Sequence, residues 1–213
     1  MKKIIISILL LCSVSFALSL DDVKRGLKSN SINEDSLEMK FKTTISSPLM
    51  GTQTMESYNV RKGPDKIYFE MKGKLINQRM IVSGRKMKVI DLKTNAERIM
   101  NTNPEMLKKM QSPVSNPMEN GNWKNPVLVS GNVYRIDGDS ATVYYDAAQK
   151  HLVKMEQNND KTNTLITFEY NPSTKQMSAM RMSIMIESKE TKIDMEFSKY
   201  QSSKNFPDRF FDF

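Results

Sequence analysis

The side chains most often used in catalysis are scarce in this sequence. His151 is the only histidine and Cys12 the only cysteine, so no second histidine is present with which His151 could hold a metal. No G-x-S-x-G segment marks a serine nucleophile, and the glycine patterns of phosphate-binding and dinucleotide-binding loops are missing. His151, between Lys150 and Leu152, fits an exposed or hydrogen-bonded structural histidine better than a catalytic base. We therefore expect no metal, no cofactor and no enzymatic activity.

Carboxylates give no stronger indication of chemistry. Asp137 and Asp139 flank Gly138 as in a calcium loop, but the later acidic ligands of an EF-hand are missing. A tight type I′ hairpin turn is the better interpretation of this segment. Glu187 and Glu190 lie in a charged hairpin. Catalysis by such a carboxylate pair stays an open alternative, but no feature of the sequence favours it.

Methionine is the unusual residue of this chain. Seventeen of the 213 residues are methionine. Many fall on the apolar side of predicted strands: Met39, Met55, Met71, Met80, Met87, Met155, Met180, Met182 and Met195. Methionine is flexible and polarisable, so a methionine-rich face suits a cavity that accepts acyl chains. The alternative is that these residues simply fill the core of a β domain.

The N-terminus predicts a secretory signal peptide over residues 1–17. Lys2 and Lys3 are followed by an apolar run over residues 4–11, and Ser15 and Ala17 are the small residues of a cleavage site. The run is too short to span a bilayer, which takes about 20 residues. Leu11 stands where a lipid-anchored protein would have a small residue before its cysteine, so Cys12 fits a hydrophobe of the signal better than a lipidation site. The expected mature protein is one domain, residues 18–213.

The charge of the chain does not indicate nucleic acid binding. The formal net charge is +8, and removal of Lys2 and Lys3 would lower it to +6. The basic residues are scattered among acidic ones, without a dense block or stacking aromatic residues. A solvated surface is the main interpretation, and attraction to anionic lipid headgroups or an acidic partner is the other.

Most of the remaining sequence alternates with a period of two. Leu37, Met39 and Phe41 alternate with Glu38, Lys40 and Lys42, which indicates a half-buried strand. Similar runs recur about every ten residues, joined by short turns, and predict roughly eleven or twelve strands in a single curved antiparallel sheet. Short helices are expected within residues 18–35 and 104–111, and residues 112–126 fit a long loop better than a domain linker.

Three segments and the C-terminal tail carry a resemblance to a known family. Residues 61–69 (RKGPDKIYF) form an arginine/proline turn and aromatic strand, residues 81–91 read IVSGRKMKVID, and Val153 to Glu156 read VKME. Together with the phenylalanine-rich, acidic tail, they resemble the LolA-like family of outer-membrane lipoprotein carriers over most of residues 18–213. In that family the lid-locking arginine directly precedes the proline. Here Gly63 precedes Pro64, and Arg61 lies two residues earlier.

The resemblance implies a mainly β fold, an incomplete antiparallel barrel of about 11 strands lidded by a few short helices. It implies a monomeric periplasmic protein that carries acyl chains of lipoproteins, or a related lipid, from an inner-membrane donor complex to an outer-membrane acceptor. The expected cavity residues are Leu37, Met39, Phe41, Ile67, Phe69, Met71, Met80, Val82, Met87 and Val89. The lid or lock candidates are Arg61, Met106, Leu107 and Met110, with Val23 and Leu27. The alternative is a non-catalytic binding, sensor or scaffold protein whose core is filled.

Overall fold

The computed structural model describes residues 18–30, 36–103, 105, 107, 117–119, 121–202 and 206–213. The predicted signal peptide (1–17) and two lid candidates, Met106 and Met110, lie outside these residues. The elements are α1 (Leu20–Asn30), β1 (Ser36–Ser47), β2 (Gly51–Lys62), β3 (Lys66–Gly73), β4 (Asn77–Ser83), β5 (Lys86–Asp91), β6 (Glu97–Asn101), η1 (Pro117–Glu119), β7 (Val127–Ser130), β8 (Val133–Asp137), β9 (Thr142–Asp146), β10 (His151–Asn158), β11 (Thr162–Tyr170), β12 (Met177–Ile186), β13 (Lys189–Ser202) and η2 (Asp208–Phe211).

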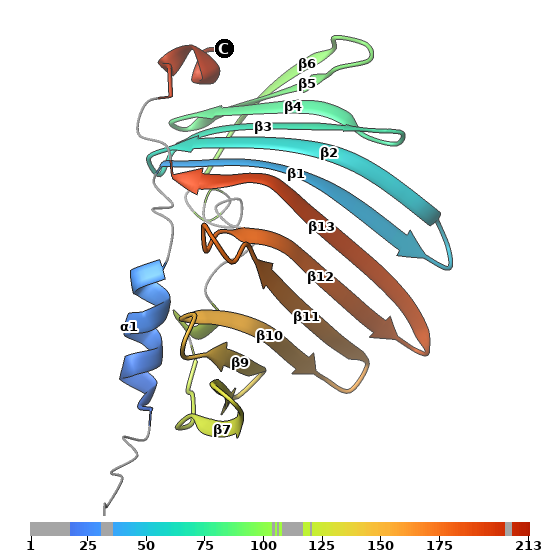
Figure 1. Ribbon diagram of the computed structural model, residues 1–213. Helices are drawn as coiled ribbons and strands as arrows, with labels where there is room; N and C mark the ends of the chain where they lie inside the picture. The colour runs from blue at the N-terminus through green and yellow to red at the C-terminus, as the bar shows by residue number, and fades with distance from the viewer. Residues whose placement is uncertain are drawn as a thin grey trace, which may run out of the picture.

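All thirteen strands belong to one antiparallel sheet, which Figure 1 shows as a strongly curved surface. The strand order is β6-β5-β4-β3-β2-β1-β13-β12-β11-β10-β9-β8-β7, so β6 and β7 are its two edges and the sheet is not closed. The predicted single curved sheet is confirmed. It has 13 strands, against the roughly eleven or twelve that alternation predicted and the about 11 that the resemblance implied.

Strand register divides the sheet into two faces of different chemistry. Residues directly opposite each other in an antiparallel pair point to the same side. Leu37, Met39 and Phe41 therefore define one side, which we call the apolar face. Glu38 and Lys40 point to the other side, which we call the polar face.

Strand β2 reverses the usual pattern. Its residues on the apolar face include Ser57, Asn59 and Arg61, whereas Tyr58 and Val60 point to the polar face. The C-terminal tail covers these two, because Phe206 and Phe211 form a small buried cluster with Val60, and Tyr58 packs against it. This second, minor core explains why β2 has apolar residues on the side where its neighbours are charged.

Helix α1 begins at a capping box and packs against the start of β10. Ser19 Oγ accepts a hydrogen bond from the Asp22 amide at 3.1 Å, and Asp22 accepts one in return from the Ser19 amide at 3.1 Å. The hydrogen bonds from Ser19, with a contribution from Arg25, lower the pKa of Asp22 to about 2. At the other end of the helix, Asn30 Nδ2 donates to the carbonyls of Gln149 and Lys150 at 2.8 and 3.2 Å. The helix is thus fixed beside the sheet, as Figure 1 shows.

The expected type I′ turn at Gly138 is not formed. A type I′ turn needs positive φ at both central residues, and none of the residues 138–141 has it. The Gly138 amide instead donates to the Ala141 carbonyl at 2.8 Å, and Gly138 forms a β-bridge with Trp123. A Cβ at Gly138 would lie 2.7 Å from the Trp123 ring, so glycine is needed here for a close approach of the two segments rather than for a turn.

Over the described residues, no helix combines the length and the apolar character that crossing a bilayer requires.

Candidate functional site

The ten expected cavity residues all lie on the apolar face, in three rows that cross strands β1 to β5. The first row contains Leu37, Ile67, Val82 and Met87, the second Met39, Phe69, Met80 and Val89, and the third Phe41 and Met71. Sequence alternation therefore placed these residues together, although they come from four separate strands. Contact with a lipid remains a prediction.

One end of the apolar face is covered by the protein's own side chains. We call this part, with Leu37, Met39, Ile67, Val82 and Met87, the filled end. None of these five side chains is more than 4% exposed. Two clusters cover them: Val23 of α1 and Met118 join the cluster of Leu37 and Met39, and Leu107 packs with Ile67, Val82 and Met87. The filled end is a packed core.

The other end of the same face is only half-buried. We call it the open end, and it includes Ile45, Met55, Met71, Met182, Ile184 and Ile193. Two neighbouring hairpin tips extend beyond it, where Leu49 is 84% and Leu75 is 66% exposed. The apolar face thus continues from a packed core to a surface on which large hydrophobic side chains meet solvent, which is uncommon for an unoccupied surface.

Four of the six lid or lock candidates can be placed, and two of them, Arg61 and Leu107, lie beside the same residue. Arg61 is 2% exposed and is paired in register with Ile67. Leu107 is 9% exposed and packs on Ile67 from above the sheet. A buried guanidinium next to the residue that Leu107 covers fits a locking role, which remains a prediction. Val23 is fully buried and Leu27 packs against the same core cluster.

The sequence analysis missed the polar side chains inside the apolar face. Ser57 is 3% and Asn59 is 7% exposed, between strands whose facing residues are apolar. The Oδ1 atom of Asn59 is buried without a hydrogen-bond partner. The period of two in β2 could have revealed them, because it places Ser57 and Asn59 opposite Phe41 and Met39 once β1 and β2 are paired as a hairpin.

His151 is buried rather than exposed, which corrects one part of the expectation. Its side chain is 6% exposed and its ring stacks on Tyr170, with 3.9 Å between ring centroids and 6° between planes. Its Nε2 atom has no hydrogen-bond partner. Burial, reinforced by the charge of Lys175, lowers the pKa of His151. Within the part of the chain that the structure describes, no hydrogen bond or ion pair joins His151 to a carboxylate, and the contact of its ring is the stack on Tyr170.

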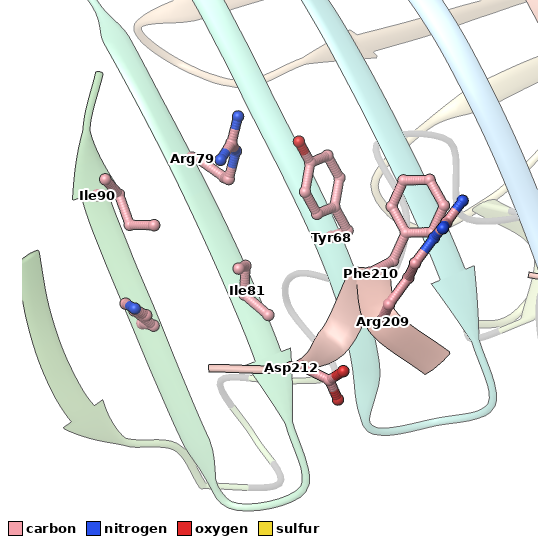
Figure 2. A pocket seen from close by; sticks show the side chains of 8 residues that line it. Tyr68, Arg79, Ile81, Ile90, Arg209, Phe210 and Asp212 are labelled. Atoms are coloured by element: carbon pink, nitrogen blue, oxygen red, sulfur yellow. The ribbon is translucent and has the colours of Figure 1, made fainter. Parts of the chain in front are cut away.

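The C-terminal tail forms a groove on the polar face, opposite the expected cavity. Asp208 Oδ1 accepts hydrogen bonds from Lys62 and Lys66, both at 2.9 Å, and these contacts hold the tail on the sheet. Figure 2 shows the side chains that line this groove between the tail and β3–β5. Its volume is about 420 Å³. Tyr68, Ile81, Ile90 and Phe210 form its apolar part, and Arg79, Lys88, Arg209 and Asp212 its charged part.

Two of the charged residues of this groove, Arg79 and Lys88, are paired with carboxylates. Glu70 accepts hydrogen bonds from Tyr68 and Arg79 at 2.8 and 2.9 Å, and its other oxygen lies 2.6 Å from Lys72 Nζ. Burial alone would raise the pKa of Glu70, but these hydrogen bonds outweigh it and lower the pKa to about 2. Lys88 pairs with Glu97 at 2.8 Å. On this part of the polar face, ion pairs thus join neighbouring strands, through Arg79 with Glu70 and Lys88 with Glu97. No cluster of three potential metal ligands occurs in the described part of the chain.

Fold and site together define a class of protein: a single open, curved antiparallel sheet with one continuous apolar face, part of it covered by a helix and by a segment between two strands. Solved structures with this fold include a LolA superfamily protein from Nitrosomonas europaea. It has a TM-score of 0.54 and 9% sequence identity, over 92% of this chain and 98% of that chain. The resemblance to LolA-like proteins is thus confirmed at the level of the fold.

Two further structures have the same fold. A domain assigned to outer membrane lipoprotein-sorting proteins, from Vibrio parahaemolyticus, has a TM-score of 0.54 and 9% identity over 89% of this chain and 94% of that chain. A DUF1329 family protein from Desulfovibrio piger has a TM-score of 0.53 and 11% identity over 90% of this chain and 95% of that chain. No family model and no curated protein matches the sequence. Identities this low establish the fold and leave the activity open.

Proposed function

We propose that this protein is a periplasmic carrier that binds the acyl chains of lipoproteins, or of a related lipid, on its apolar face and moves them towards the outer membrane. The observation that carries the proposal is the open end, where Ile45, Met55, Met71 and Met182 form half-exposed apolar surface continuous with the core. Cleavage after Ala17 would release the protein, as a shuttle requires.

The energetics of acyl transfer favour a site of this kind. Each methylene removed from water contributes about 0.8 kcal/mol, so ten methylenes contribute about 8 kcal/mol before the ordering of the chain is deducted. A carrier has to shield the chain and still release it. Methionine side chains can mould to a chain without a fixed shape, so the methionines of the open end suit a site that shields a chain and still releases it.

The second candidate is a non-catalytic binding, sensor or scaffold protein, and the filled end favours it. Leu37, Ile67 and Val82 already have protein partners and need no ligand. In that case the open end would be an interface for a protein partner instead of an acyl site. The two candidates differ in whether the protein holds lipid.

Native mass spectrometry of the protein purified without detergent distinguishes them. We expect a bound diacyl lipid that a Met182→Lys variant loses, because the new charge would lie on the apolar face. Met185→Lys is the matched control, since Met185 lies three residues along the same strand on the polar face. Lipid-free wild-type protein that also fails to bind palmitate would refute the carrier and leave the scaffold.

A further inference from the structure

The polar positions of β2 lie at the boundary between the two ends of the apolar face. Asn59 is flanked in register by Met39 of β1 and Phe69 of β3. Met39 is 1% exposed and belongs to the filled end, whereas Phe69 is half-buried. The amide group of Asn59 therefore lies inside the apolar face, at the inner limit of the open end.

The protein around Asn59 leaves the oxygen of its side-chain amide without a hydrogen bond. Its Oδ1 atom is buried and accepts no hydrogen bond. The large majority of buried side-chain polar atoms in native structures have a hydrogen-bond partner, because an unpaired one destabilises the fold. The neighbours in register are a thioether and a phenyl ring, neither of which can donate to it. An acceptor left in this state at the edge of a ligand surface indicates a donor on the ligand.

We propose that Asn59 accepts a hydrogen bond from a donor on or next to the bound acyl chain, and so selects amide-linked or hydroxylated acyl chains over plain ones. This inference rests on the proposed acyl binding. A plain acyl ester offers only methylenes and acceptors at this position, and it leaves Oδ1 unpaired. An amide N–H at the head of the chain or a hydroxyl along it completes the bond.

The proposed route of the ligand to Asn59 starts at the open end, and the side chains that bury Oδ1 would have to move aside. Met71 lies two residues beyond Phe69 on β3, and both are half-buried. Further in, Leu107 packs over Ile67, which is the residue paired with Arg61 in the next row. An acyl chain lying along Met71 and Phe69 would therefore meet Asn59 before it meets the covered part of the face.

Matched pairs of ligands test the selection. The first pair is N-palmitoylglycine methyl ester and the analogue in which an ester oxygen replaces its N–H. The second pair is 3-hydroxypalmitate and palmitate. Competition against a fluorescent acyl probe on the full-length mature protein should show about tenfold tighter binding of the donor-bearing member of at least one pair. Which pair shows the preference identifies the source of the donor.

Substitution of the acceptor supplies the second arm. In Asn59→Leu, and in the smaller Asn59→Val, the preference should vanish while plain acyl chains bind as before. The Tm of the ligand-free variants should not fall, because an unpaired buried acceptor has been removed. Gln53→Leu is the matched control, since it removes an amide from the same face of the same strand nearer the hairpin tip.

The possible results distinguish the role of Asn59 from acyl binding itself. Equal binding within both pairs by wild-type protein would overturn the role of Asn59 and leave acyl binding intact. A preference that survives in Asn59→Leu and Asn59→Val would also overturn it. Failure of every acyl ligand to compete would overturn both.

Discussion

The two ends of the apolar face share strands β1 and β3 and have the same kinds of residue, yet they differ in what covers them. Ile67 at the filled end is 1% exposed under Leu107, whereas Ile45 at the open end is half-buried. Ile67 belongs to a core in which the protein's own side chains cover it. Ile45 belongs to a surface that the protein's own side chains cover only in part. The difference shows that alternation in sequence specifies a face, and that distant segments decide whether this face becomes core or site.

The largest expected effect comes from truncating one isoleucine at each end. Ile67→Ala should destabilise the protein by about 2–5 kcal/mol, because it leaves a cavity in a packed cluster. Ile45→Ala should cost clearly less, since its side chain is partly solvated and the site can relax. Urea denaturation of both variants measures the difference. Equal losses would mean that the open end is as well packed as the filled end.

A smaller effect with an informative sign is expected at Gly26 in α1. Alanine in place of glycine in an exposed helix stabilises by about 1 kcal/mol. A Cβ at Gly26 would, however, lie 2.1 Å from the Tyr145 hydroxyl oxygen, so we expect Gly26→Ala to destabilise by about 1–3 kcal/mol. Thermal denaturation gives the sign. Tyr145→Phe in the same chain should recover part of the loss, and a stabilised single variant would show that α1 does not pack on β9.

The smallest expected effect is a pH dependence of stability that comes from His151, at the start of β10. Burial and then Lys175 lower its pKa, while Asp146 opposes them. The folded protein therefore favours the neutral ring. Below about pH 6.5, His151 takes up a proton more readily in the unfolded chain than in the folded protein. The stability of the fold therefore decreases as the pH is lowered. Urea midpoints at pH 7.5 and 5.5 should converge in His151→Phe, which retains the stack on Tyr170. An unchanged pH slope in that variant would contradict a buried neutral histidine.

The sequence predicted the faces of the sheet better than it predicted their cover. Alternation in β1, β3, β4 and β5 was sufficient to bring ten residues onto one side, because a period of two fixes the side of each residue. It could not show that Asn30 would bind the Lys150 carbonyl, 120 positions away, and thereby close one end of that side.

The errors have the same origin. His151 and Gly138 were interpreted from their immediate neighbours, whereas their surroundings are set by Tyr170 and Trp123. Strand β2 has apolar residues on the polar face because the C-terminal tail packs there, through Phe206 and Phe211. Such contacts join segments that no local pattern connects. The residues that could be predicted are those whose role depends on strand geometry alone.

The central claim is that an acyl chain binds at the open end and leaves the filled end packed. The methionine methyl groups report on both ends in one experiment. In ¹³C-methyl-methionine NMR spectra, addition of palmitate should shift the signals of Met55, Met71 and Met182 strongly and those of Met39 and Met87 little, assigned by single Met→Leu substitutions. If the Met55, Met71 and Met182 methyl groups do not respond to palmitate, the open end is not an acyl site and the account is contradicted.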